Sequence, residues 1–126
     1  MNTPFDILGG KTFSSIVNAD NEELIFTATT GEKYIFGHRQ SCCESVGIVD
    51  ICGDLNDLVG TPLLCAEERT QYDSNEGIAP EDIPKYQDCF MWTFYEFRTI
   101  KGSVTVRWHG DSNGYYSVSV DFWETK

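Results

Sequence analysis

Hydrophobic and polar residues alternate most clearly in the last third of the chain. Segments 103–109 and 115–122 place an apolar residue at every second position, which is typical of half-buried β-strands. Asn113-Gly114 lies between them and favours a tight hairpin, because both residues accept positive φ. The aromatic-rich segment 90–97 comes earlier and connects to 103–109 through Lys101-Gly102. The pattern predicts a three-strand meander at the C-terminal end.

The same periodicity, in a looser form, predicts further strands upstream. They cover residues 12–17, 23–28, 33–36, 45–51 and 62–67. Residues 54–59 are expected to form one short helix, since Asp54 can cap its start and Gly60 can end it. A chain of 126 residues suits one hydrophobic core. We therefore expect a single domain, residues 1–126, of the mainly β or α+β class, with about seven to eight antiparallel strands.

The stretch 70–88 breaks the alternation. It is polar and acidic and contains Pro80, Pro84 and Gly77. Loops of this length are usually functional when they are ordered. We expect a long acidic loop that either binds a partner or covers the polar face of the last strands.

Charge narrows the class of partner. The chain has 20 acidic and 9 basic residues, a net charge of −11, and residues 1–88 hold 16 of the acids against 5 bases. Such a surface argues against binding nucleic acid or anionic membranes, and it attracts basic proteins.

Neither a signal peptide nor a bilayer-spanning apolar run is evident. Five cysteines include an adjacent pair, which is a poor disulfide framework. We therefore expect an intracellular protein without disulfides.

One constellation has the residue types of a metal site. His38, Cys42 and Cys43 lie within six residues, and Cys52 follows. Imidazole and thiolate are preferred ligands of Zn²⁺, so these four residues are the predicted ligands of a structural zinc ion. The fourth place is open to Cys52, Cys65, His109 or a carboxylate. The alternative is that the cysteines pack as small apolar residues and that His38 caps a turn.

The acidic residues of the first two-thirds are the predicted partner-binding surface. They are Glu44, Asp50, Asp54, Asp57, Glu67, Glu68, Asp73 and Glu76. Solubility alone would also account for such a charge.

No catalytic signature is complete. Gly10-Lys11-Thr12 lacks the first glycine of a phosphate-binding loop, and Asp54–Asp57 lacks the glycine and distal glutamate of a calcium loop. We therefore expect a binding protein that is not an enzyme. Two alternatives stay open: a sponge for a nucleotide signal, using Arg39, Arg98 or Arg107, and a metal-dependent enzyme acting through His38 and His109.

Two sequence blocks resemble a family of small, uncharacterised proteins encoded mainly by bacteriophages. The first block runs from His38 through Cys42-Cys43-Glu44-Ser45-Val46 and Asp50-Ile51-Cys52-Gly53-Asp54-Leu55 to Ala66-Glu67-Glu68, and the second joins Trp92-Thr93-Phe94-Tyr95 to Ser112-Asn113-Gly114-Tyr115-Tyr116-Ser117.

The resemblance implies a phage origin and carries no activity. In size, charge and character the chain is also similar to type II-A anti-CRISPR proteins, which inhibit an RNA-guided nuclease. That similarity implies an inhibitor acting in the host bacterial cytoplasm, where it binds the basic surface of a CRISPR effector nuclease or of another nucleic-acid enzyme.

Overall fold

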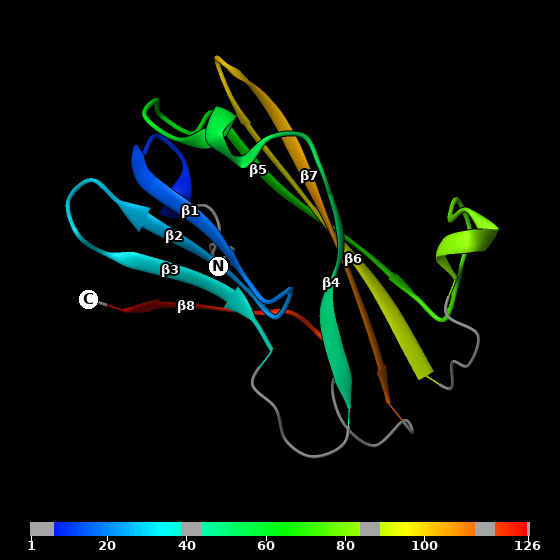
Figure 1. Cartoon of the computed structure of the whole chain (residues 1–126). Helices are drawn as coiled ribbons and strands as arrows, with labels where there is room; N and C mark the ends of the chain where they lie inside the picture. The colour runs from blue at the N-terminus through cyan, green and yellow to red at the C-terminus, as the bar shows by residue number, and fades with distance from the viewer. Residues whose placement is uncertain (1–6, 39–43, 84–88, 113–117, 126) are drawn as a thin grey trace.

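The described residues form eight β-strands in a computed structural model (Figure 1). The structure describes residues 7–38, 44–83, 89–112 and 118–125. The strands are β1 (Phe13–Ala19), β2 (Glu23–Ala28), β3 (Lys33–Gly37), β4 (Ser45–Cys52), β5 (Cys65–Tyr72), β6 (Cys89–Thr99), β7 (Gly102–Ser112) and β8 (Asp121–Thr125). The 3₁₀ helices η2 (Leu55–Leu58) and η3 (Pro80–Asp82) lie between strands. No helix in these ranges is long and apolar enough to cross a membrane.

The strands are arranged in two four-stranded antiparallel sheets. Sheet I has the order β1-β2-β3-β8, and sheet II has the order β4-β7-β6-β5. Figure 1 shows sheet I on one side of the molecule and sheet II facing it. The mainly β, single-domain prediction is confirmed, although the strands are divided between two sheets.

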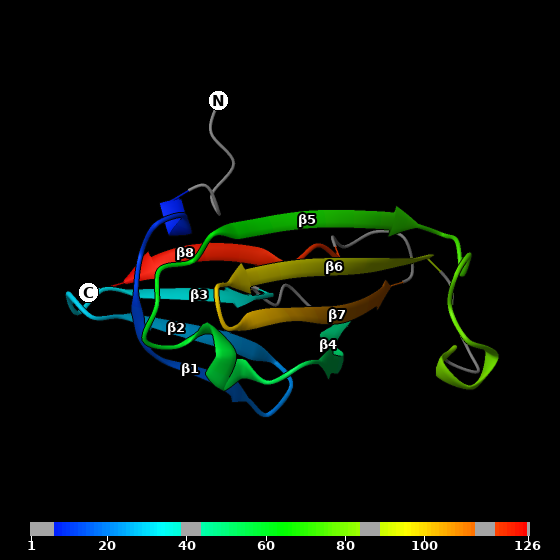
Figure 2. The ribbon, with the colours of Figure 1, turned by 90° about the horizontal axis from the view of Figure 1, so that it is seen from above.

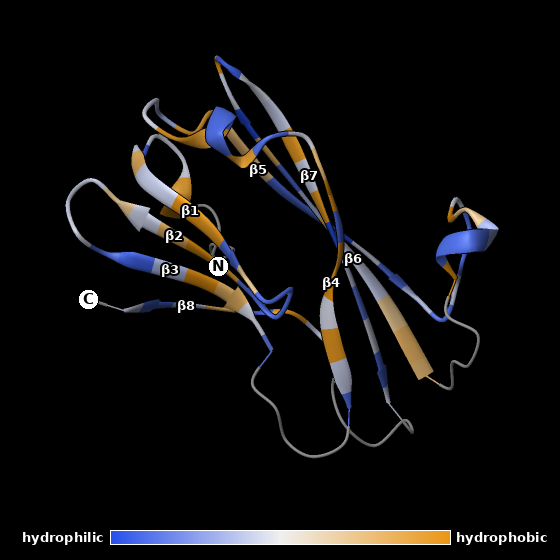
Figure 3. Ribbon diagram, viewed as in Figure 1, coloured by the Kyte–Doolittle hydropathy of each residue, from blue (hydrophilic) through white to orange (hydrophobic). Residues whose placement is uncertain are grey.

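The core lies between the sheets and is rich in aromatic residues. Phe26 and Phe36 of sheet I contact Phe97 of sheet II, with ring centroids 5.0 and 5.6 Å apart. Buried and less buried residues alternate along β2 and β7, so that every second side chain points into the core. Figure 3 shows the same pattern as apolar and polar segments that follow one another along the strands.

The C-terminal meander differs from the prediction. Strands β6 and β7 form the expected hairpin, with Thr99 opposite Gly102. Of the strand predicted over 115–122, residues 115–117 lie outside the described residues and 118–120 are not in a strand. The last strand, β8, begins at Asp121 and pairs with β3 in sheet I, so the three consecutive neighbours of sheet II are β5, β6 and β7. The predicted Asn113-Gly114 turn lies outside the described residues. Phe122 gives the physical reason, because its ring stacks on Tyr34 at 6.0 Å and so anchors β8 in sheet I.

The short helix forms close to its predicted place as a single 3₁₀ turn. Asp54 caps it, since its carboxylate accepts a hydrogen bond of 2.9 Å from the backbone N–H of Asn56. Lys101, at the tip of the β6–β7 hairpin, donates to the carbonyls of Asn56 and Val59 at 3.2 and 2.5 Å. The hairpin tip therefore holds the turn against sheet II.

The predicted loop 70–88 is shorter than expected, because β5 continues to Tyr72. Residues 73–83 then fold over the outer face of sheet II, on the side away from sheet I (Figure 1). There, Trp92 donates from Nε1 to Asn75 Oδ1 at 2.9 Å, and Trp92 and Ile78 are both buried. This segment therefore covers part of the sheet, as one of the two sequence interpretations expected.

Candidate functional site

A buried pair of ionisable side chains lies at one end of the two sheets. His38 directly follows β3, and Glu44 directly precedes β4. Their side chains are only 5% and 0% exposed, and Nε2 of His38 lies 2.7 Å from Oε2 of Glu44. The other ring nitrogen, Nδ1, lies 2.7 Å from the carbonyl oxygen of Ser119, ahead of β8. The imidazole thus joins the ends of strands from both sheets.

The oxygen partners of this ring constrain which nitrogen carries a hydrogen. A carbonyl oxygen only accepts hydrogen bonds, so Nδ1 carries a hydrogen and donates to Ser119. The contact between Nε2 and Glu44 then shares a further proton, either as imidazolium and carboxylate or as neutral imidazole and carboxylic acid. The carboxylate of Asp121 lies 3.8 Å from Nδ1 and adds negative charge on the same side.

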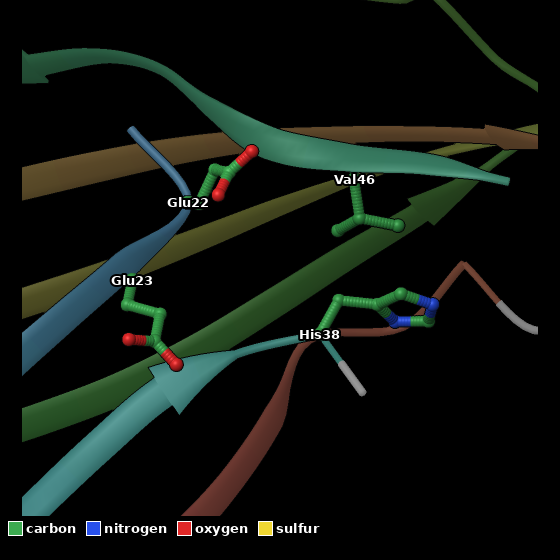
Figure 4. Close-up of a pocket in the computed structure, with 4 residues that line it drawn as sticks. All are labelled: Glu22, Glu23, His38 and Val46. Carbon is green, nitrogen blue, oxygen red and sulfur yellow. The ribbon is translucent and has the colours of Figure 1, made fainter. Parts of the chain in front are cut away.

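An acidic cleft opens beside this pair. It has a volume of about 370 Å³ and is lined by Glu22, Glu23, His38 and Val46. Figure 4 shows the two glutamates on one side of the cleft and His38 and Val46 on the other. No lysine or arginine among the described residues forms an ion pair with Glu22 or Glu23. Such a cleft suits a cationic group of a partner.

The turn between β1 and β2 positions both glutamates. Asp20 and Asn21 have φ of 55° and 61°, the left-handed conformation that a tight hairpin turn requires. The carbonyl of Asn21 accepts a 2.6 Å hydrogen bond from the backbone N–H of Ile48, which fixes the turn against β4.

Gly37 brings Glu23 close to an aromatic side chain. A Cβ at this position would lie 3.1 Å from Cγ of Glu23 and 3.2 Å from the ring of Trp123. Both side chains therefore converge over the missing side chain of Gly37, between β2 and β8.

Those predicted zinc ligands that belong to the described residues lie apart from one another. Both ring nitrogens of His38 already have oxygen partners, and Cys52 is exposed at the opposite end of β4 from Glu44. Cys65 lies in β5, and His109 lies on the outer face of sheet II. Within the described ranges no three His, Cys, Asp or Glu side chains are grouped to hold a metal ion.

Cys42 and Cys43 lie outside the described residues, so zinc binding through them stays a prediction. His38 could join them only by releasing Glu44 or Ser119.

The predicted acidic surface separates into several places. Glu67, Glu68, Asp73 and Glu76 follow one another along β5 and the segment after it, and all are exposed. Asp54 and Asp57 belong to η2 and its cap.

The remaining two predicted residues have internal partners. Glu44 is buried with His38 and is not part of the surface. Asp50 accepts a 2.6 Å hydrogen bond from Arg107. The cleft residues Glu22 and Glu23 were not among the predicted sites, and their only sequence signal is the acidic run Asp20–Glu23 at a turn.

The described arginines of sheet II already have carboxylate or aromatic partners within the protein. Arg107 donates to Asp50 and Asp82 at 2.6 and 3.0 Å, and these carboxylates raise its pKa although burial opposes the charge. Arg69 lies 4.3 Å from the ring centroid of Phe94, and Arg98 pairs with Glu96 at 3.3 Å. This outer face therefore offers little free positive charge to a nucleotide, whereas Arg39 lies outside the described residues.

His109 lies in an aromatic cluster on the outer face of sheet II. Its ring lies 4.6 Å from that of Trp92 and 6.0 Å from that of Phe90, centroid to centroid. Burial lowers the pKa of His109, and the negative charge of Asp111 opposes this only in part. The folded protein therefore favours the neutral imidazole.

This shift predicts a pH dependence of stability. Because the folded-state pKa is depressed, the unfolded chain binds a proton first, and the free energy of unfolding falls as pH decreases through about 6.5. Below the lowered pKa of His109 the effect levels off. We expect the variant His109→Phe, which keeps a ring beside Trp92, to lose this part of the slope in urea unfolding curves between about pH 7.5 and about pH 5.5. An unchanged slope in the variant would contradict the assignment.

The fold and the site define a small two-sheet antiparallel β protein with an acidic cleft at one end of the sheets. Over residues 6–122 the chain matches the sequence profile of DUF7448, a domain of unknown function. The chain belongs to this family. No curated protein and no solved structure matches it.

Proposed function

We propose that this protein is a phage-encoded inhibitor that binds a basic surface of a host nucleic-acid enzyme, in the first place a type II CRISPR effector nuclease. The observation that carries the proposal is the open cleft whose carboxylates, Glu22 and Glu23, have no cationic partner among the described residues. A negatively charged cleft of this kind attracts basic side chains and orients their approach.

Two further observations support a binding role. Two of the described basic residues have partners within the protein, since Arg107 pairs with two aspartates and Lys101 donates to the carbonyls of Asn56 and Val59. The net charge of −11 leaves an excess of acidic side chains that these pairs do not neutralise. RNA-guided nucleases hold their nucleic acids in basic channels, which are complementary to such a surface.

The proposal is tested by capture and by activity. Immobilised protein is incubated with a purified type II effector nuclease, and target cleavage is then measured at saturating protein. We expect co-purification and loss of cleavage. Full cleavage activity at saturating protein would exclude this partner class.

Neutralising the cleft tests where the partner binds. We expect the double variant Glu22→Gln/Glu23→Gln to bind the nuclease about tenfold more weakly at low salt, because two charge contacts are lost, and the difference should shrink as ionic strength rises. The matched control is Glu81→Gln/Glu124→Gln, which removes the same charge at two exposed positions outside the cleft. Equal weakening in both double variants would show that only net charge matters.

A further inference from the structure

The two sheets have four edge strands, and three of them are obstructed. β1 contains an irregularity between Phe13 and Ser15, and isolated bridges join Phe13 to Val59 and Thr12, just before β1, to Pro62. β4 has a register shift between Ile48 and Asp50, and the β1–β2 turn caps the backbone N–H of Ile48. β8 has only five residues. Irregular pairing, coverage and short length are three of the devices by which proteins block sheet edges, and charged side chains are another.

Among the described residues, none of the first three features is found within β5. It spans eight residues, Cys65–Tyr72, without proline, and its register with β6 has no shift between these residues, while Leu64, just before the strand, donates to the carbonyl of Arg98 at 2.7 Å. Figure 2 shows β5 at the margin of sheet II, beyond β6. The apolar side chains of Leu64 and Tyr72, at its two ends, are 61% and 67% exposed. An open, regular edge of this length is a template for another strand.

The register identifies which backbone groups face outward. Asp73 donates its backbone N–H to Phe90, and the register continues this pairing at every second residue along β5. The odd-numbered residues of β5 therefore bond to β6. The backbone N–H and C=O groups of the even-numbered residues point to the free edge, and these residues are Ala66, Glu68, Thr70 and Tyr72.

The charged side chains of β5 indicate which kind of added strand would suit this edge. Glu67 lies on the outer face of sheet II and faces Glu96 across the pair, an arrangement of like charges that costs stability and that the ion pair of Arg98 with Glu96, 3.3 Å, offsets only at Glu96. Glu68 lies on the inner face, where Tyr95 donates to it at 2.6 Å. Arg69 lies over the ring of Phe94 of β6. A strand added beside β5 would meet one carboxylate on each face.

We propose that the free edge of β5 binds an extended segment of the partner protein that contains two adjacent basic residues, as an added strand. Neighbouring residues of a strand point to opposite faces, so two consecutive lysines or arginines would reach Glu67 and Glu68. A second copy of this chain is a poor occupant, because symmetric pairing about Glu68 brings two glutamates together and both chains carry a net charge of −11. The inference rests on the proposed function for the basic character of the partner.

The test uses the full chain and a short fluorescein-labelled peptide with two adjacent lysines inside alternating threonine and valine. We expect Thr70→Pro to weaken binding about tenfold, since it removes an outward N–H and blocks close approach, while Thr70→Ala binds as the wild type does. Proline is tolerated at this position because the N–H does not pair with β6. Amide hydrogen exchange should slow on binding at Ala66, Glu68 and Tyr72.

A second peptide makes the test independent of folding of the variants. It carries backbone N-methyl groups on both lysines, so neither of its edges can pair continuously, although its charge is unchanged. We expect the wild-type protein to bind it at least about tenfold more weakly. Equal binding of both peptides would overturn the proposal in favour of charge attraction alone. A dimer of the free protein that Thr70→Pro abolishes would overturn it in favour of self-pairing.

The result also separates this inference from the proposed function. Loss of peptide binding in Thr70→Pro supports the edge site whether or not the nuclease is inhibited. Inhibition of the nuclease with no preference between the two peptides supports the proposed function and rejects the edge site.

Discussion

Replacing Phe36 by alanine is expected to lower the free energy of unfolding by about 3–5 kcal/mol, the cost of emptying a large aromatic position in a core. The Phe36 side chain is fully buried. Its ring lies 4.7 Å from Phe122 and 4.8 Å from Tyr95, centroid to centroid. Phe36 and Phe122 belong to sheet I and Tyr95 to sheet II, so the cavity would open at the interface that holds the sheets together.

The adjacent residue provides a matched control. Ile35 lies in the same strand but on the outer face of sheet I, where it is only partly buried. We expect Ile35→Ala to cost about 1–2 kcal/mol in urea unfolding, well below the cost at Phe36. If both variants lost the same stability, the sheets would not be joined through the aromatic core described above.

Removing the carboxylate of Glu44 is expected to have the second large effect. Glu44→Ala leaves the buried imidazole of His38 without its partner at Nε2, and breaking a buried pair in this way costs about 3–5 kcal/mol. The loss should appear in urea unfolding and should be accompanied by loosening of the ends of β3, β4 and β8, measurable as faster amide exchange there.

Two further variants test whether the loss in Glu44→Ala comes from the buried pair with His38. Asp50→Ala removes another carboxylate hydrogen bond of 2.6 Å, but Asp50 is half exposed and Arg107 retains Asp82. We expect it to cost less than about 1 kcal/mol. The double variant His38→Leu/Glu44→Leu should be less destabilised than the sum of its single variants, because no unpaired polar group is left inside. Additive losses would mean that His38 and Glu44 do not act as a pair.

The sequence predicted most of the strands because alternation is a local property. Segments 23–28 and 33–36 correspond closely to β2 and β3, and Asp54 caps the turn that it was expected to cap. Sheet membership could not be predicted, since alternation shows that one face of a strand is buried but not against which neighbour. For that reason the last strand was predicted beside segment 103–109, whereas β8 pairs with β3 in the other sheet.

The candidate site was predictable only in part. His38 and Glu44 stood out as chemically significant residues, but their pairing depends on how β3 and β4 meet across the two sheets. The role of Glu44 also differs, because its carboxylate is buried, whereas it was expected on the partner-binding surface. Glu22 and Glu23 were overlooked because an acidic turn is common, and only the packing of that turn against β4 makes it one wall of a cleft.

Glu23 and Trp123 lie close together over Gly37, so the intrinsic fluorescence of Trp123 should be sensitive to what binds near Glu23. Of the three tryptophans, Trp92 and Trp108 are buried, and Trp123 is partly exposed beside a carboxylate of the cleft. Indole emission shifts and is quenched when the surroundings of the ring change. Occupation of the cleft should therefore register in the fluorescence of the unlabelled chain, and a soluble quencher would report chiefly on Trp123 and on whatever shields it.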